Sequence, residues 1–145
     1  MQLDQIKNMY DKDSQIDGTE LDIESIKLPQ LHNKYLNLLQ DEKLVLRKLI
    51  ADKSEMFRLK WEYYSGKMDK DELDKYGWEP FQLNILKKDI DIYINSDKDL
   101  RLIQDRISYH EVILSYLEEI LKEINGRHWK IRNAIEWRKF TNGGF

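Results

Sequence analysis

The sequence predicts a mainly all-α protein that forms a single domain over residues 1–145, and three observations favour this class. The 145 residues include only six glycines and two prolines. Charged residues make up 35% of the chain, against about a quarter in an average domain. Two long stretches without glycine or proline carry apolar residues at alternating spacings of three and four, which is the period of a helix face. Aromatic residues, at 11%, argue against a disordered chain.

The charge is divided unevenly along the chain, although its formal total is only −3. Residues 1–26 form an acidic N-terminal segment with seven acidic and two basic residues, whereas residues 127–145 carry five basic residues and one acidic residue. Ends of opposite charge favour attraction between subunits, or a tail that meets phosphate. The alternative interpretation is an uneven but solvated surface.

The first long helix is predicted from Pro29 to Tyr64. Proline is suited to a first helical turn, and Gly66 is suited to the left-handed position that follows a last turn. At 1.5 Å per residue the helix would be about 54 Å long, which is too long for the interior of one compact domain. A helix with two apolar stripes needs two neighbours, so we expect self-association. The two stripes are Leu28, Leu31, Tyr35, Leu38, Val45, Leu49, Met56, Leu59 and Tyr63, and Leu36, Leu39, Leu46, Ile50, Phe57, Trp61 and Tyr64.

Residues 67–80 are polar, with glycine and proline near their end, and predict a loop with about one helical turn. The next stretch is ambiguous. Ile90, Ile92 and Ile94 alternate as in a short strand near 88–94, but Ile90 and Ile94 also fit a helix face with Leu83 and Leu86. Because a lone strand would have no partner, the helix is favoured over residues 85–95.

A second long helix is predicted after Ser96-Asp97-Lys98-Asp99, which resembles a capping box. Asn125-Gly126 is expected to end this helix, and a third, basic and aromatic helix is expected from about His128 to Phe140. The apolar stripe of the second helix consists of Leu100, Ile103, Ile107, His110, Leu114, Leu117, Leu121 and Ile124.

The sequence offers no support for catalysis, a metal site or a cofactor. Without cysteine there is no disulfide, zinc ribbon or thiol nucleophile, and a reducing compartment is expected. The Gly66-Lys67 pair lacks the earlier glycine of a P-loop, and the acidic loop after Asp69 lacks the glycine and glutamate of an EF-hand. No signal peptide or long apolar run is found, so we expect a soluble, cytoplasmic protein that is not an enzyme.

Residues 57–67 combine cations with aromatic rings. Proteins that bind single-stranded nucleic acid use cations that follow the phosphates and flat side chains on which bases stack. For three of the rings, at positions 57, 61 and 64, helical spacing favours ordinary core residues over stacking platforms. The candidate DNA-binding residues are Arg58, Lys60, Lys67, Trp61, Tyr63 and Tyr64.

At these residues the sequence resembles the UvsY family, the recombination mediator proteins of tailed phages. The resemblance rests on a basic-x-basic pair, Arg58-Leu59-Lys60, that runs into Tyr63-Tyr64-Ser65-Gly66-Lys67. It extends upstream to residues 16–21 and downstream to residues 96–100 and 131–140. It therefore covers most of the chain, from about residue 15 to residue 143, in the same order.

The resemblance implies a non-enzymatic protein that binds single-stranded DNA and forms a ring-like homo-oligomer. Such a protein helps a RecA-like phage recombinase to displace the phage single-strand-binding protein, inside the bacterial host cell. The family's DNA-binding pair corresponds to Arg58 and Lys60, and its assembly helix to residues 131–140. With the stripe of the second helix, the candidate assembly residues are Leu114, Leu117, Leu121, Ile131, Ile135, Trp137 and Phe140.

The acidic total charge is unusual for a mediator and implies a modest, salt-sensitive affinity in each subunit. An oligomer compensates, because several weak sites act together on one strand. The alternative function is a helical scaffold or adaptor that oligomerises through its heptad stripes without binding nucleic acid.

Overall fold

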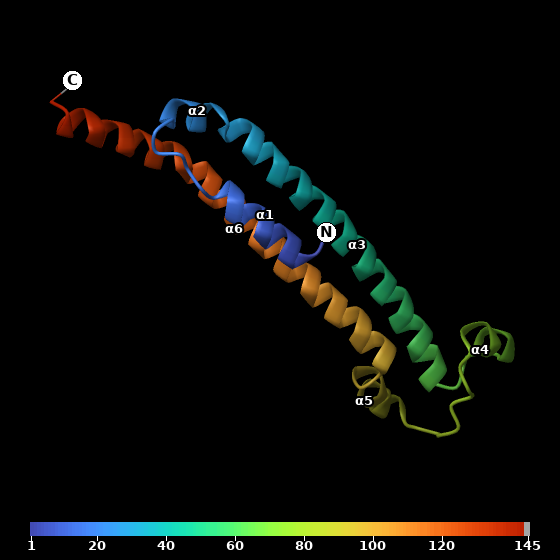
Figure 1. Cartoon of the computed structure of the whole chain (residues 1–145). Coiled ribbons are helices and arrows are strands. Elements are labelled where there is room, and N and C mark those ends of the chain that lie inside the picture. The colour runs from blue at the N-terminus through green and yellow to red at the C-terminus, as the bar shows by residue number, and fades with distance from the viewer. Residues whose placement is uncertain (144–145) are drawn as a thin grey trace. The chain divides into compact units, whose positions relative to one another are not determined.

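The computed structural model describes residues 1–143, and all of its regular elements in this range are helical. The last two residues of the expected C-terminal tail, 144–145, lie outside the described residues. In chain order the elements, labelled in Figure 1 where there is room, are α1 (Leu3–Asp13), α2 (Leu21–Ile26), α3 (Leu28–Tyr64), α4 (Lys70–Tyr76), the 3₁₀ helix η1 (Lys87–Asp89), α5 (Ile90–Asn95) and α6 (Lys98–Thr141). The prediction of an all-α fold is confirmed.

The chain forms two compact units. Unit 1 consists of Met1–Lys43 together with Val112–Phe145, and unit 2 consists of Leu44–Glu111. Helices α3 and α6 each contribute one part to each unit. The acidic N-terminal segment 1–26 contains α1 and α2 and belongs to unit 1.

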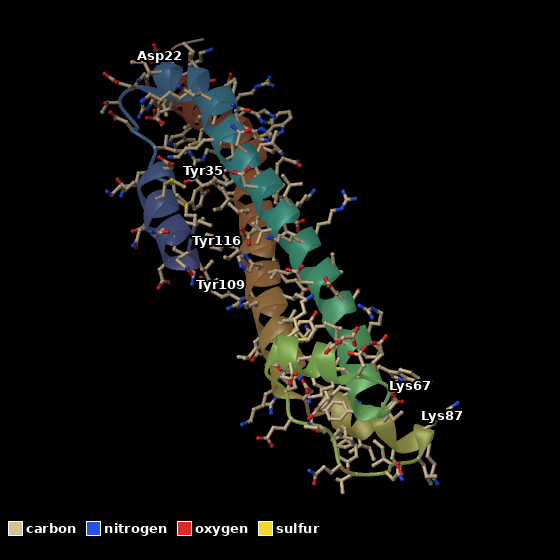
Figure 2. All side chains as sticks on the ribbon, turned by 90° about the vertical axis from the view of Figure 1, so that its right-hand side faces the viewer. Asp22, Tyr35, Lys67, Lys87, Tyr109 and Tyr116 are labelled. Carbon is tan, nitrogen blue, oxygen red and sulfur yellow. The ribbon has the colours of Figure 1, made fainter. Side chains whose placement is uncertain are left out.

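Unit 1 is built around α1, the first part of α3 and the later part of α6. Its centre is formed by aliphatic side chains and one tyrosine: Ile6, Tyr35, Leu39, Ile113, Leu117, Ile120, Leu121 and Ile124. Tyr35, labelled in Figure 2, reaches from α3 to α1, where its hydroxyl donates to Asp13 at 2.8 Å and its ring meets Tyr10 edge-on. Lys34 forms an ion pair with the same carboxylate at 2.6 Å. These contacts fix α1 against α3.

A buried arginine links α1 to α6 inside unit 1. Arg127 is only 2% exposed, and its Nε donates to Glu123 at 3.1 Å while its guanidinium lies near the Tyr10 ring. The Tyr10 hydroxyl also donates to Glu123. Burial, together with the hydrogen bond to Glu123, raises the pKa of Tyr10 to about 12, so this donor stays protonated at neutral pH.

The predicted break at Asn125-Gly126 is wrong, because α6 runs without interruption from Lys98 to Thr141. A glycine inside a helix costs about 1 kcal/mol relative to alanine. Arg127 and Ile131, just after it, are buried in unit 1, as is Ile124 just before it. Packing on both sides of the glycine therefore outweighs its low helix propensity, and the basic C-terminal helix is the last part of α6.

Gly126 lies in open space, since a Cβ atom built on it would meet no other atom within 4 Å. Replacing Gly126 with alanine is therefore expected to raise the free energy of unfolding by about 0.5–1 kcal/mol. Urea denaturation followed by circular dichroism measures the change. The matched control is Gly66→Ala, which should destabilise the protein because the φ of Gly66 is +76°. Equal effects of the two changes would contradict this prediction.

Unit 2 is built from the later part of α3, the whole of α4 and α5, and the first part of α6. Leu59, Met68 and Leu73 form one buried cluster, which fixes α4 beside the end of α3. A second buried cluster contains Ile90, Ile94 and Leu100 from α5 and α6. The two clusters hold the segments that follow Tyr64 against the end of α3.

The local expectations for unit 2 are confirmed in part. Helix α3 ends at Tyr64, as predicted, and Gly66 has the expected positive φ. Segment 67–80 contains more helix than the single turn expected, because the Asp69 carboxylate caps α4 by accepting from the Glu72 amide at 2.8 Å. The alternative of a strand near 88–94 is wrong. Residues 87–95 are helical there, with Ile90 and Ile94 buried and Ile92 exposed.

Candidate nucleic-acid interface

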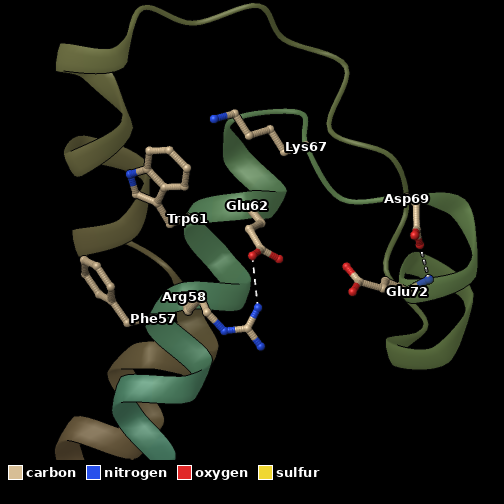
Figure 3. A pocket seen from close by; sticks show the side chains of 7 residues that line it. All are labelled: Phe57, Arg58, Trp61, Glu62, Lys67, Asp69 and Glu72. Atoms are coloured by element: carbon tan, nitrogen blue, oxygen red, sulfur yellow. Dashed lines mark hydrogen bonds and ion pairs between the residues drawn. The ribbon is translucent and has the colours of Figure 1, made fainter.

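The end of α3 and the start of α4 border an open hollow of about 810 Å³ in unit 2 (Figure 3). Two aromatic rings and two cations line it together with three acidic side chains. The lining residues are Phe57, Arg58, Trp61, Glu62, Lys67, Asp69 and Glu72. We refer to this feature as the α3 hollow.

Arg58 and Glu62 lie one helical turn apart on the side of α3 nearer α4 (Figure 3). The Arg58 guanidinium donates to the Glu62 carboxylate at 3.0 Å, and the Arg58 side chain is 59% exposed. An exposed pair of this kind contributes at most about 1 kcal/mol to stability. The guanidinium can therefore exchange this carboxylate for a phosphate at low cost.

Trp61 and Phe57 lie on the other flank of α3 (Figure 3), and both rings can reach solvent. Trp61 is half-buried against the second cluster of unit 2, and Phe57 is 45% exposed. The exposed Lys67 places its ammonium 4.9 Å from the centroid of the Trp61 ring. The ammonium thus makes a cation–π contact with the indole, and the two side chains are of the kinds that contact phosphates and stack on bases in single-strand-binding proteins.

Lys60 does not border the α3 hollow, although it belongs to the same unit. It is buried, and its ammonium forms ion pairs with Asp97 at 3.1 Å and Asp99 at 2.8 Å. The same ammonium lies 4.0 Å from the centroid of the Trp78 ring. Of the three candidate DNA-binding cations, Arg58 and Lys67 border the α3 hollow, whereas Lys60 is buried away from it.

Asp97 is the centre of this buried group. Its carboxylate accepts from the Leu100 amide at 3.1 Å, which caps α6, and from the Tyr64 hydroxyl at 2.5 Å. Burial by itself would raise the pKa of Asp97, but the hydrogen bonds from Tyr64, Leu100 and Lys60 outweigh it and hold the pKa below its usual range. Asp97 is therefore ionised at neutral pH, and burial raises the pKa of Tyr64 well above its ordinary value.

The two tyrosines predicted to stack on bases are engaged within unit 2. The Tyr63 hydroxyl donates to the Glu79 carbonyl at 2.6 Å, and its ring meets that of Trp78 edge-on. The Tyr64 ring packs against Phe81 and Tyr93. Both rings are half-buried in this aromatic cluster, so Trp61 and Phe57 are the rings that border the hollow.

The candidate assembly residues fall into two groups within unit 1. Leu117, Leu121 and Ile131 are buried by the protein's own helices, and Leu114 and Ile135 are half-buried. Trp137 and Phe140 are 65% and 75% exposed, and their rings stack on each other with centroids 5.7 Å apart. These two rings therefore form an exposed apolar surface in the last turns of α6.

No metal site is found among residues 1–143, where histidine and acidic side chains do not gather in groups able to hold an ion. Within the same residues, no helix has both the length and the apolar character needed to cross a bilayer.

Two residues of unit 2 escaped the sequence-based prediction of the site. Trp78 covers the Lys60 ammonium, and Asp97 neutralises it. The sequence indicates Asp97 only as part of a helix cap, and nothing in its spacing shows that it also binds a lysine of α3. The sequence does carry one signal for Trp78. It is a large aromatic residue between Gly77 and Pro80, in a segment expected to be a loop, where a buried role is the simplest explanation for it.

Comparison with known proteins places the chain. The family model described as "Recombination, repair and ssDNA binding protein UvsY" matches residues 9–144. The recombination protein uvsY of Enterobacteria phage T4 is 26% identical over 143 residues, which cover 99% of both chains. Two crystal structures of the bacteriophage T4 recombination mediator protein UvsY superpose with a TM-score of 0.85. Their sequence identities are 24% and 25%, with 97% and 98% of this chain covered and 99% and 98% of theirs. The chain belongs to the UvsY family.

Proposed function

We propose that this protein is a recombination mediator, which binds single-stranded DNA and helps to load a RecA-like phage recombinase onto DNA covered by single-strand-binding protein. The observation that carries this function is the match of the family of recombination, repair and single-stranded DNA binding proteins to residues 9–144. The mediator acts by binding and assembly rather than by catalysis.

The α3 hollow is the surface proposed to contact the DNA. Arg58 and Lys67 are the exposed cations for phosphates, and Trp61 with Phe57 supplies rings for unpaired bases, at about 1–3 kcal/mol for each stacked base. Tyr63 and Tyr64, the last two residues of α3, anchor its end by packing against the two buried clusters of unit 2. Three acidic residues also line the hollow, so the affinity of each subunit is modest. With one phosphate on each of the two cations, the slope of log affinity against log salt is about −1.4 per subunit.

A ring-like homo-oligomer makes these weak sites effective. Trp137 and Phe140 are the proposed contacts between subunits, because their stacked rings form an exposed apolar surface at the end of α6. Several hollows in one ring act on one strand at high effective concentration, which raises the overall affinity without any new contact. By bending the strand, the ring weakens the binding of the competing single-strand-binding protein to the DNA.

Light scattering with and without a labelled single-stranded oligonucleotide tests this function. The expected result is a particle of several subunits that binds the oligonucleotide, and the logarithm of its affinity should fall linearly as log salt rises. Double-stranded DNA of the same length is the control and should compete weakly. An oligomer that shows no binding even at low salt would instead support the helical adaptor.

A further inference from the structure

The helical geometry of α3 separates the two cations of the Arg58-Leu59-Lys60 motif. Successive residues of an α-helix are rotated by about 100° about the helix axis. Residues two apart are therefore rotated by about 200° and lie on nearly opposite sides of the helix. The contacts agree with this geometry. Arg58 borders the α3 hollow, whereas Lys60 points to the start of α6 and to Trp78. One strand of DNA lying in the hollow therefore reaches Arg58 and not Lys60.

The surroundings of Lys60 are also unfavourable for a phosphate. Its ammonium is shared by Asp97 and Asp99, so the group carries one positive and two negative charges. The Lys60 residue is 5% exposed and the side chain of Asp97 is 4% exposed. Turning the ammonium outward would leave the buried carboxylate of Asp97 without its cation, which is a costly change.

Lys60 connects three segments of unit 2. It belongs to α3, its carboxylate partners lie at the start of α6, and Trp78 follows α4. Asp97 strengthens the connection, since it caps α6 through the Leu100 amide and binds the hydroxyl of Tyr64, one turn after Lys60 on α3. These contacts therefore fix the rotation of the last turns of α3 about the helix axis, relative to the start of α6.

We propose that Lys60 is a positioning residue for the DNA-binding surface rather than a phosphate contact. By joining α3 to Asp97, Asp99 and Trp78, it keeps Arg58 and Trp61 turned toward the α3 hollow. This inference rests on the proposed function, because it assigns the DNA strand to that hollow. It divides the motif into a cation that meets the strand and a cation that orients the helix.

The test compares Lys60→Met with Arg58→Ala in the full-length protein, using a labelled thymidine oligonucleotide at several salt concentrations. Arg58→Ala should reduce the slope of log affinity against log salt by about 0.7 per subunit, since one phosphate contact is lost. Lys60→Met should leave that slope unchanged and lower the urea midpoint of unfolding. At a temperature where its helical signal equals that of the unchanged protein, Lys60→Met should still bind about fivefold or more weakly. Unchanged affinity there would mean that Lys60 serves stability alone.

Asp99→Asn keeps the inference testable if Lys60→Met fails to fold. The Asp99 side chain is 46% exposed, and its loss leaves the pair between Lys60 and Asp97 in place. If Lys60 turned outward to bind phosphate, removing this competing carboxylate would make the salt slope steeper. The expected slope is instead that of the unchanged protein.

Two outcomes separate this inference from the proposed function. If the unchanged protein does not bind the oligonucleotide at low salt, the proposed function and this role of Lys60 are both wrong. If it binds, and Lys60→Met reduces the salt slope as much as Arg58→Ala does, only the positioning role is overturned.

Discussion

Replacing Leu117 with alanine is expected to lower the free energy of unfolding by about 2–5 kcal/mol, the usual cost of emptying a filled core site. Leu117 is 0% exposed in unit 1, where it packs in the cluster that contains Ile6, Tyr35 and Ile124. The cavity cannot close easily, because its walls come from three helices, α1, α3 and α6. Urea denaturation followed by circular dichroism measures the loss.

The control is Glu118→Ala, which truncates an exposed side chain one position further along α6 and should change the free energy of unfolding by less than about 0.5 kcal/mol. Particle mass, measured by light scattering, provides the second readout. The heptad pattern predicts Leu117 as a contact between subunits, and that role would reduce the mass while sparing the stability of the subunit. We expect the reverse result, with the mass unchanged at temperatures where the variant is folded.

The double change Arg58→Ala with Lys67→Ala should weaken binding to single-stranded DNA more than the loss of any two exposed cations of unit 2 that lie outside the α3 hollow. Both side chains border the α3 hollow, and each is expected to neutralise one phosphate. Losing both should reduce the slope of log affinity against log salt by about 1.4 per subunit. In a ring the loss is repeated in every subunit, so the overall affinity falls far more than that of one site. Fluorescence anisotropy with a labelled oligonucleotide measures both quantities.

The matched control is Lys48→Ala, which removes an exposed cation from the same helix outside the hollow. It should leave the salt slope unchanged. The particle mass of the double variant should equal that of the unchanged protein, because neither side chain belongs to the proposed assembly surface. An equal loss of slope in Lys48→Ala would mean that DNA binds to α3 without preference for the hollow.

The long helices could be predicted because their signals are local. Pro29, Gly66 and an apolar period of three and four residues specify α3 to within one residue at its start. Gly126 was misleading for the same reason. A local stop signal competes with packing, and the partners of Arg127 and Ile131 cannot be seen from neighbouring residues. Tertiary contacts in unit 1 decided that position, as often happens with a single glycine.

The candidate site was predictable in its composition but not in its division of roles. The motif at residues 58–67 correctly indicated a cluster of cations and rings, and Arg58, Trp61 and Lys67 do border one hollow. The burial of Lys60 depends on Asp97 and Trp78, which lie in other segments of unit 2. Lys60 was expected at the surface and is buried, and Phe57 shows the reverse. Helical spacing favours a core position for Phe57, but this residue is 45% exposed.

The division of the chain into units has a consequence for the order in which the protein folds during synthesis. Unit 2 is one continuous stretch, Leu44–Glu111, so all of its contacts become available before those that complete unit 1. Unit 1 joins the two ends of the chain, and the contact between Tyr10 and Glu123 spans 113 residues. Helix α1 can therefore pack on α3 early through Asp13, but the α6 side of the cluster around Ile6 stays open until the C-terminal part of α6 leaves the ribosome.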